Sequence, residues 1–292
     1  MASLGALALT DRKAADESLE PHKKPTPLLK WAGGKGQLLP QMTSYFPEDL
    51  GTYHEPFLGG GAVFFHLSPR KAVLSDSNPD LIHVYRMVRD NPYGLKTQLD
   101  LHKKHSKEKA YFYHVREMQP RGLQPVARAA RTVFLNKTCF NGLYRVNSKG
   151  EFNVPYGGYR NPSLYLEENL HLTSAALQGA KLRVEDFRLA CKHPRKGDFV
   201  YLDPPYQPLT KTSSFTNYTR EGFGRRDQED LAAIFGALDR RGCKVMLSNS
   251  STAWLRELYQ EYYQVTLRAK RAINCKGTGR GAIDELLVMN YP

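Results

Sequence analysis

The chain has 292 residues, of which 41% are hydrophobic, so it can bury a substantial core as one large domain or as a core with an insert. Its 42 Lys and Arg residues exceed its 29 Asp and Glu residues, and the formal net charge of +13 favours a polyanionic partner. A basic chain would also suit a membrane surface, but no stretch approaches the roughly 18 apolar residues of a spanning helix. We therefore expect no membrane association.

The first 26 residues differ in composition from the rest of the chain. They mix charges and lack the basic start and apolar run of a secretory signal, so we predict that residues 1–26 form a mostly disordered extension. The following stretch, Leu28 to Gln37, sets Lys35 between glycines but lacks the Gly-x-x-x-x-Gly-Lys-Ser/Thr spacing of a phosphate loop. Lys35 would instead neutralise a carboxylate. Trp31 would either stack on a cofactor or anchor the core.

A glycine-rich turn follows the first predicted strand end. Glu55-Pro56-Phe57-Leu58-Gly59-Gly60-Gly61 precedes a helix predicted from Ala62, and glycine there permits close approach of the backbone to a ligand. A second strand is predicted from Lys71 to Asp76. Asp76 follows Phe57 by about 20 residues, the step at which an acidic residue meets ribose hydroxyls in nucleotide-binding units. Because the glycines do not follow Gly-x-Gly-x-x-Gly, a nucleoside-like cofactor without a pyrophosphate fits better than a dinucleotide.

Residues 91–166 have a different character, with concentrated basic and aromatic side chains. Val126, Ala130, Val133 and Phe134 recur at helical spacing and predict a packed helix face. Asn141-Gly142 and Lys149-Gly150 are turn signals, the second of them compatible with a short hairpin. Most of the lysines taken singly indicate only a solvated surface.

The most informative run is Phe199-Val200-Tyr201-Leu202-Asp203-Pro204-Pro205-Tyr206. Phe199 to Leu202 predicts a buried parallel strand, and two prolines must end it because they cannot donate to a ladder. Asp203 and a neighbouring carbonyl could accept both hydrogens of a conjugated amine, and the Tyr206 ring could stack on a base. The plainer alternative is a strand-ending turn.

Further strands are predicted at residues 181–184, 244–248 and 286–289. The stretch Glu185-Asp186-Phe187 directly follows the first of these strands. The four cysteines form no Cys-x-x-Cys pair and the nine histidines form no ligand pattern, so neither a disulfide framework nor a metal site is indicated. A reducing cytoplasm is the compartment we expect for such a chain.

These motifs, in this order, resemble the Dam family of bacterial and phage DNA adenine N6-methyltransferases, the D12 or α class. The matching pieces are Lys-Trp-Ala-Gly-Gly-Lys, Glu-Pro-Phe-x-Gly-Gly-Gly, Ser-Asp-x-Asn, Phe-Asn-Gly-Leu-Tyr-Arg-Val-Asn and Asp-Pro-Pro-Tyr, between about Leu28 and Tyr291. The resemblance implies an α/β, Rossmann-like S-adenosylmethionine-dependent methyltransferase core, residues 27–90 and 167–292. It also implies a helical target-recognition insert, residues 91–166.

The resemblance also implies roles for individual residues. The implied catalytic residues are Asp203, Pro204 and Tyr206. The implied S-adenosylmethionine contacts are Trp31, Lys35, Phe57, Gly59, Asp76, Asp186, Phe187 and Asp203. The implied DNA-binding residues are Lys30, Phe140, Asn141, Leu143 and Arg145. Phe140 departs from the tyrosine of some members, so it keeps a ring but loses a hydroxyl.

The expected activity is methyl transfer to adenine N6 in double-stranded DNA, with the adenine extruded from the stack and GATC as the implied target. Two alternatives stay open: another amino methyltransferase, acting on cytosine N4, RNA or a protein amide, or a non-catalytic DNA-binding protein of the same fold. No cysteine accompanies the Pro-Pro motif, which argues against cytosine C5 methylation. The resemblance implies a bacterial or phage-encoded, cytoplasmic and nucleoid-associated enzyme, and leaves a companion restriction endonuclease open.

Overall fold

Seven strands form one mixed sheet in the order β3-β2-β1-β4-β5-β7-β6. The strands are β1 (Tyr53–Glu55), β2 (Ala72–Asp76), β3 (Ala180–Val184), β4 (Phe199–Leu202), β5 (Lys244–Ser250), β6 (Tyr263–Lys270) and β7 (Ala282–Met289). Strands β1 to β5 pair in parallel, whereas β7 lies antiparallel to both β5 and β6. The computed structural model describes residues 23–206, 223–270 and 282–292.

The strand β4 shows why this segment forms the centre of the sheet. All four of its residues are buried, and they alternate between two hydrophobic clusters. Phe199 and Tyr201 belong to the cluster on one face, and Val200 and Leu202 belong to the cluster on the other. A strand covered on both faces needs an uninterrupted apolar run, which this sequence supplies.

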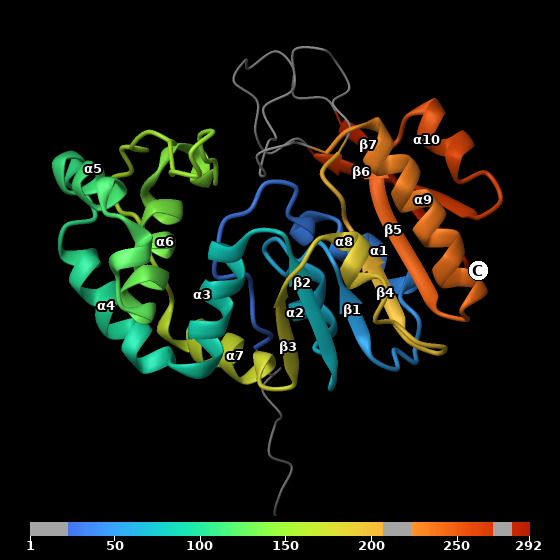
Figure 1. Cartoon of the computed structure of the whole chain (residues 1–292), viewed down its shortest axis with the longest axis horizontal. Coiled ribbons are helices and arrows are strands. Elements are labelled where there is room, and N and C mark those ends of the chain that lie inside the picture. Colours follow the sequence, from blue (N-terminus) through green and yellow to red (C-terminus); the bar gives the residue numbers. More distant parts are fainter. Residues whose placement is uncertain (1–22, 207–222, 271–281) are drawn as a thin grey trace, which may run out of the picture.

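Helices cover both faces of the sheet (Figure 1). They are α1 (Leu39–Met42), α2 (Ala62–Leu67), α3 (Pro79–Asp90), α4 (Pro92–Lys104), α5 (Lys109–Glu117), α6 (Pro125–Thr138), α7 (Glu167–Leu177), α8 (Phe187–Ala190), α9 (Arg225–Arg240) and α10 (Ala253–Leu258). The hydrophobic cluster formed with α8, α9 and α10 includes Val245 and Leu247 of β5. The cluster formed with α2, α3 and α6, on the other face, includes Met246 of the same strand. The predicted Rossmann-like core is therefore confirmed.

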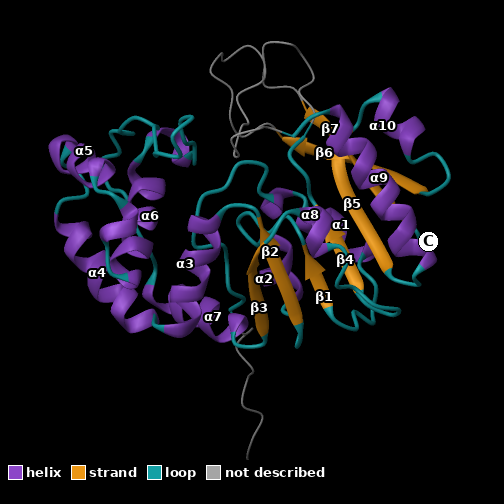
Figure 2. Cartoon of the chain, viewed as in Figure 1, coloured by secondary structure: helices purple, strands orange, loops and turns teal. Residues whose placement is uncertain are grey.

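The helices α4, α5 and α6, with the segment that follows them, gather beside the β3 edge of the sheet and form a helical lobe, residues 91–166 (Figure 2). The predicted helix face in α6 is buried at Ala130, Val133 and Phe134. Asn136, fully buried, donates to the carbonyl oxygen of Lys30 and accepts from its N–H, at 2.8 Å in each case. The lobe is thus hydrogen-bonded to the segment that leads into the core.

The predicted strands at residues 199–202, 71–76, 181–184, 244–248 and 286–289 are all present, with small differences at their ends. Strand β6 was missed, because its charged and polar residues interrupt any apolar run. The hairpin near Lys149-Gly150 is reduced to a single bridge between Val146 and Phe152.

The N-terminal segment 1–26 lies mostly outside the described residues. Its last four residues, however, contact the folded chain. Lys23 pairs with Glu168, and Thr26 exchanges hydrogen bonds with Asn169 of α7. Those four residues belong to the folded part rather than to a disordered extension.

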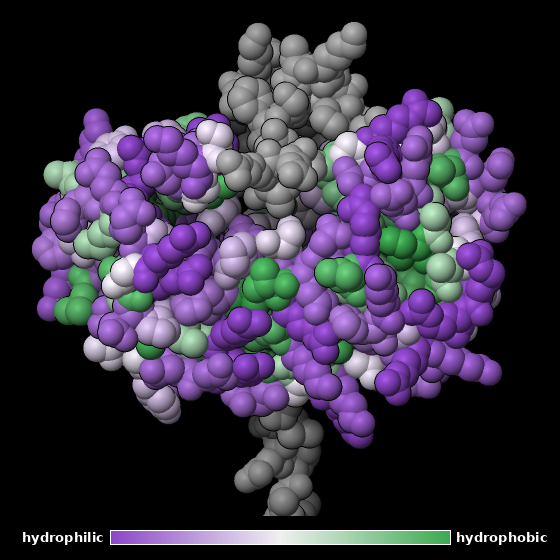
Figure 3. Space-filling view, in the orientation of Figure 1, coloured by the Kyte–Doolittle hydropathy of each residue, from purple (hydrophilic) through white to green (hydrophobic). Residues whose placement is uncertain are grey.

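The surface of the face in Figure 3 is mostly hydrophilic, and its hydrophobic residues form small scattered patches, among them one near the middle and one on the β5 side of the sheet. Within the described residues, no helix combines the length and the apolar character needed to cross a bilayer.

Candidate active site

The carboxyl ends of β1 and β4 lie side by side, because these strands pair in parallel with His54 opposite Val200. β1 pairs with β2 on its other side, so the order of strands reverses between β1 and β4. Ligands of open α/β sheets bind beyond the strand ends at such a switch point. A cavity of about 1040 Å³ opens there, lined in part by residues 31–37, 55–63, 186–188 and 203–206.

Asp203 lies directly after β4 and is held by two donors on one of its oxygens. Lys35 Nζ is 2.8 Å from Asp203 Oδ1, and Ser248 Oγ donates to the same oxygen at 3.2 Å. Ser248 is itself fixed by the Tyr201 hydroxyl at 2.7 Å. Among the described residues, no donor reaches Asp203 Oδ2. One oxygen is therefore anchored, and the other is free to accept a hydrogen from a ligand in the cavity.

Burial raises the pKa of Asp203, while Lys35 and the Ser248 hydroxyl act in the opposite direction. The Lys35 side chain is only 2% exposed and also donates to the Gly33 carbonyl oxygen at 2.9 Å. A buried ammonium so close to a carboxylate stabilises its charged form. Lys35 and Ser248 thus offset part of the desolvation of Asp203.

Tyr206 ends the Asp-Pro-Pro-Tyr turn with its ring beside Lys35, whose Nζ lies 4.7 Å from the ring centroid. Its hydroxyl donates to Glu285 Oε2 at 2.6 Å. Pro204 is buried, and its carbonyl oxygen has no donor among the described residues. The Pro205 carbonyl oxygen, in contrast, accepts from Gln228 Nε2 at 3.3 Å. The turn thus offers the Pro204 carbonyl and the Asp203 carboxylate as open acceptors.

The glycine turn after β1 forms a second wall of the cavity. Gly59 has φ +48° and Gly61 has φ +70°, both in the left-handed region that favours glycine. A Cβ at Gly59 would lie 2.8 Å from Cδ1 of Trp31, so the indole packs directly on this backbone. The sequence motif therefore permits a close approach that a larger residue would prevent.

Asp76, at the end of β2, faces the same cavity. Its carboxylate accepts from the N–H groups of Gly59 at 3.0 Å and Asn78 at 2.9 Å. Burial raises the pKa of Asp76 to about 6, although both N–H groups lower it. A partly desolvated carboxylate of this kind gains from additional donors such as ribose hydroxyls.

Aromatic rings close the cavity on the side of α8. Phe57 and Phe187 stack with ring centroids 5.2 Å apart, and Phe223 packs edge-on against Phe57 at 5.8 Å. Asp186 caps α8 by accepting from the Arg188 N–H at 2.9 Å. The predicted residues Phe57, Asp186 and Phe187 thus lie around one end of the cavity.

Trp31 combines the two roles left open by the sequence. It lines the cavity, and its ring also stacks on Tyr144 of the helical lobe at 5.4 Å. Tyr144 in turn donates from its hydroxyl to Asp80 of α3 at 2.8 Å. The indole is therefore both a cavity wall and a packing contact between the core and the lobe.

Among the predicted DNA-binding residues, Lys30 lies against the turn that carries Phe140 and Asn141. Lys30 is exposed, and its Nζ lies 4.6 Å from the Tyr159 ring centroid. A Cβ on Gly142 would come within 2.8 Å of the Lys30 Cβ, so the lysine stem crosses the Phe140-Asn141-Gly142 turn. In that turn Phe140 is 47% exposed and Asn141 adopts φ +56°. An exposed aromatic ring on a tight turn is thus presented next to a lysine.

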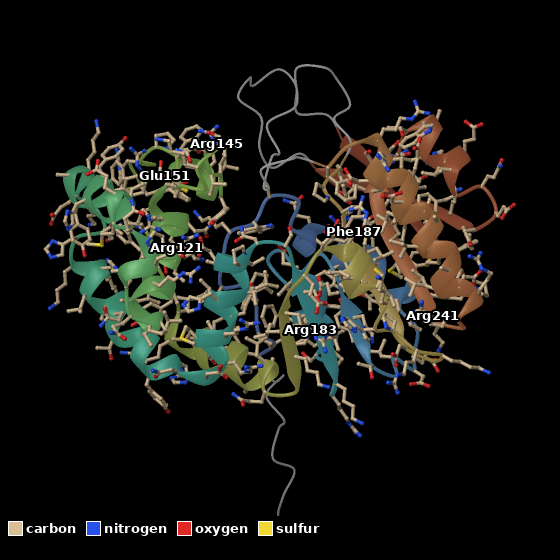
Figure 4. All side chains as sticks on the ribbon, viewed as in Figure 1. Arg121, Arg145, Glu151, Arg183, Phe187 and Arg241 are labelled. Carbon is tan, nitrogen blue, oxygen red and sulfur yellow. The ribbon has the colours of Figure 1, made fainter. Side chains whose placement is uncertain are left out.

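Leu143 is partly buried against the core, whereas Arg145 lies at the upper end of the helical lobe (Figure 4). Arg145 Nε donates to Asn153 Oδ1 at 2.7 Å, which holds the guanidinium in place. In the same figure Phe187 lies on α8 in the sheet domain, across from the lobe. Arg145 therefore lies on the helical lobe and Phe187 in the sheet domain, whereas Lys30 directly precedes the cavity residue Trp31.

Several residues that line the cavity or contact its lining side chains were not predicted. Ser248 and Glu285 contact the Asp203 and Tyr206 side chains, and Arg188 and Phe223 line the opposite end. Ser248 lay within a predicted strand, and Glu285 directly precedes another. Recognising that β7 runs antiparallel would have placed the start of this strand at the same edge of the sheet.

Cys139, Cys191 and Cys243 are free and buried, and Cys275 lies outside the described residues. In the described part of the chain, no group of three or more His, Cys, Asp or Glu side chains is arranged to hold a metal ion.

The reversed sheet order, the glycine turn after β1 and the Asp-Pro-Pro-Tyr turn after β4 define the class of Rossmann-like methyltransferases. Residues 31–273 match the family of D12 class N6 adenine-specific DNA methyltransferases. The chain belongs to this family, which confirms the resemblance and identifies it as an adenine-specific DNA methyltransferase.

Full-length relatives support the assignment. The type II methyltransferase M1.LlaDCHI of Lactococcus lactis subsp. cremoris is 44% identical over 271 residues, which cover 91% of this chain and 95% of that protein. The type II methyltransferase M.MjaIII of Methanocaldococcus jannaschii is 44% identical over 285 residues, covering 91% and 99%. The DNA adenine methylase of Salmonella typhi is 35% identical over 272 residues, covering 92% and 97%. Adenine in DNA is therefore favoured over cytosine N4, RNA or a protein amide.

Proposed function

We propose that the chain methylates adenine N6 in double-stranded GATC sites, with S-adenosylmethionine as the methyl donor. The observation that supports it most strongly is Asp203, a carboxylate with one anchored and one open oxygen at the switch point of the sheet. S-adenosylmethionine, when bound, supplies a methyl group on a positively charged sulfur.

The cavity residues fit this donor. Asp76 is a buried acceptor suited to ribose hydroxyls, and the Phe57 and Phe187 rings offer flat apolar surfaces for an adenine. Gly59 keeps the backbone close to the ligand because its φ of +48° admits no side chain without strain. Trp31 forms the wall between this end of the cavity and the helical lobe.

The chemistry requires an amine with an available lone pair. Adenine N6 is conjugated with its ring, so the lone pair is delocalised and the amino group is planar. Asp203 and the Pro204 carbonyl oxygen would accept hydrogen bonds from its two N–H groups and turn the nitrogen toward a pyramidal geometry. As the N–CH3 bond forms and the S–CH3 bond of the donor breaks, N6 would lose one of these two protons. This is orientation and electrostatic stabilisation rather than covalent catalysis.

The target adenine must leave the base stack for this contact to form. Adenine N6 is paired inside a duplex, whereas Asp203 has a side chain only 19% exposed at the bottom of the cavity. We infer that the base is flipped into the cavity and that the Tyr206 ring replaces part of the lost stacking. Phe140, 47% exposed on its tight turn, would fill the space left in the duplex.

We assign sequence reading to residues 91–166, with Lys30, Asn141, Leu143 and Arg145 facing the DNA. Arg145 has the fork geometry to bind guanine O6 and N7 in the major groove, and Asn153 orients its guanidinium. The choice of GATC rests on the family resemblance of the Phe140–Arg145 stretch. The two type II methyltransferases among the relatives support the further proposal that a restriction endonuclease accompanies this enzyme in a bacterial or phage-infected cytoplasm.

Methylation of GATC and its single-base variants tests the target. We expect the wild type to prefer GATC, and Arg145→Ala to lose about 1 to 3 kcal/mol of discrimination at one guanine. Lys104→Ala, on the exposed end of α4, is the control and should weaken all sequences equally if it has any effect. A wild type that ignores GATC would refute the target, and uniform weakening by Arg145→Ala would reassign that residue to the phosphate backbone.

A further inference from the structure

Glu285 brings a further carboxylate to Lys35 and Tyr206, from a strand outside the Asp-Pro-Pro-Tyr motif. Because β7 runs antiparallel to β5, with Glu285 opposite Ser250, the start of β7 reaches the edge where the parallel strands end. The Glu285 side chain is 15% exposed, and its Oε2 lies 3.9 Å from Lys35 Nζ. The same oxygen accepts from the Tyr206 hydroxyl at 2.6 Å.

Tyr206 depends on contacts from other segments for its position. It lies outside any helix or strand, at the end of a proline turn whose backbone makes no regular pairing. Lys35 lies over its ring, and Glu285 holds its hydroxyl. A cation on the ring and an acceptor at its tip together restrict both the tilt and the rotation of the side chain.

The distribution of charge favours a tight bond between Glu285 and Tyr206. Lys35 is the cation nearest to both carboxylates, but it lies 2.8 Å from Asp203 and 3.9 Å from Glu285. Glu285 therefore finds its shortest contact in the Tyr206 hydroxyl. Burial raises the pKa of Glu285, while Lys35 and the Tyr206 hydroxyl oppose this shift, and a hydrogen bond formed away from bulk water is stronger than an exposed one.

We propose that Glu285 is a positioning residue for methyl transfer, which holds the Tyr206 ring against the target adenine through the Tyr206 hydroxyl. Glu285 acts through Tyr206 rather than on the reacting atoms. The inference rests on the proposed function, in which adenine enters the cavity between Asp203 and Tyr206.

The test compares Glu285→Ala, Glu285→Gln, Tyr206→Phe and the double variant Tyr206→Phe/Glu285→Ala. Asp284→Ala is the matched control, because it removes an exposed carboxylate from the neighbouring position of β7. We expect roughly 10- to 100-fold lower kcat for Glu285→Ala and Tyr206→Phe, as for a misplaced binding group, with the KM for the methyl donor nearly unchanged. Glu285→Gln keeps an acceptor oxygen and should therefore retain most of the wild-type kcat.

The double variant separates a shared role from two independent ones. If Glu285 acts through its hydrogen bond to the Tyr206 hydroxyl, the double variant should be no slower than the slower single variant, because both changes remove the same interaction. A duplex with 2-aminopurine at the target position gives a second readout. Its fluorescence in the complex should be higher for Glu285→Ala than for wild type, since a ring no longer held over the base quenches it less.

The inference would be overturned if Glu285→Ala and Asp284→Ala had equal kcat. It would also be overturned if the fold-reduction in kcat of the double variant equalled the product of the two single reductions. Thermal unfolding of each variant shows whether it folds; should Glu285→Ala unfold, Glu285→Gln and Tyr206→Phe carry the comparison because they preserve side-chain size. A wild type that neither methylates adenine nor changes 2-aminopurine fluorescence would instead refute the proposed function. An active wild type with an indifferent Glu285→Ala refutes only the role of Glu285.

Discussion

Asp76 shows how burial of one carboxylate links ligand binding to pH. Its pKa is raised to about 6 by burial, whereas an Asp in an unfolded chain titrates near ~3.9. At a pH between these two pKa values, Asp76 is therefore protonated in the folded state and ionised in the unfolded state. The contribution of Asp76 to the free energy of unfolding falls by about 3 kcal/mol as the pH rises through this window.

We predict that S-adenosylmethionine binds more tightly as the pH rises through about 6, because ribose hydroxyls donate to the ionised form of Asp76. The affinity should increase by roughly tenfold per pH unit below that value and level off above it. Calorimetric titrations of wild type and Asp76→Asn check this expectation. The Asn variant should bind more weakly at pH 7 and lack the pH dependence, and equal pH profiles for the two proteins would contradict the role of Asp76.

Gly59 is a position where the addition of one Cβ atom should lower the stability of the fold. Gly59→Ala would force a Cβ to within 2.8 Å of the Trp31 indole at a φ of +48°, so we expect a loss of about 1 to 3 kcal/mol in the free energy of unfolding. The control is Gly122→Ala, which meets nothing within 4 Å. Urea unfolding of both variants measures the difference, and equal stabilities would show that the indole does not pack on this backbone.

At the scale of elements, α8 and α9 are joined by one arginine. Arg188 of α8 donates to Asp227 at 2.6 Å and to Asp230 at 2.6 Å, both on α9, and its Cζ lies 4.3 Å from the Phe187 ring centroid. Its side chain is 38% exposed, so solvent screens the pairs and their contribution to stability is small. Their effect is to fix α8, and with it the Phe187 ring.

We therefore expect Arg188→Ala to raise the KM for S-adenosylmethionine about 10-fold, the equivalent of one or two hydrogen bonds, while kcat stays near the wild-type value. Arg225→Ala, which removes an exposed arginine from the start of the same α9, serves as control. Steady-state kinetics with the donor varied at saturating DNA distinguishes them. An unchanged KM in Arg188→Ala would mean that α8 needs no such clamp.

Elements with strong local signals could be predicted from the sequence, and those that depend on distant contacts could not. β4 and the glycine turn were found because an apolar run, two prolines and three glycines each restrict the backbone directly. β6, whose apolar residues Tyr263, Val265 and Leu267 only alternate with polar ones, was missed because its pairing with β7 could not be read from the sequence. Glu285 was missed for a similar reason, since only the antiparallel direction of β7 brings it to Tyr206.

At the scale of the whole molecule, buried contacts join the helical lobe to the core. Asn136 of α6 bonds the Lys30 backbone twice, and Tyr144 both stacks on Trp31 and donates to Asp80. Breaking a buried polar contact leaves its partner unsatisfied, so separation of the two parts would be costly. The lobe is thus attached rigidly at the point where the cavity wall begins.

We expect the core and the lobe to unfold in one transition. Tryptophan fluorescence, from Trp31 at the junction and Trp254 of α10, and far-ultraviolet circular dichroism of the helices should give the same urea midpoint. Asn136→Ala should lower that midpoint for both probes together. Two separate transitions in the wild type would show that the lobe is an independent folding unit.

The most direct test of the proposed mechanism is the single-turnover rate of N6-methyladenine formation in a GATC duplex, measured by mass spectrometry for wild type, Asp203→Asn and Asp203→Ala. The Asp203 carboxylate accepts the amine hydrogen in our proposal, so Asp203→Ala should be slower by roughly 10³-fold or more, with DNA affinity retained because phosphate contacts lie elsewhere. Asp203→Asn keeps one acceptor but no charge and should fall between the two. A near-normal rate in a folded Asp203→Ala protein would contradict the claim that this residue activates the adenine amine.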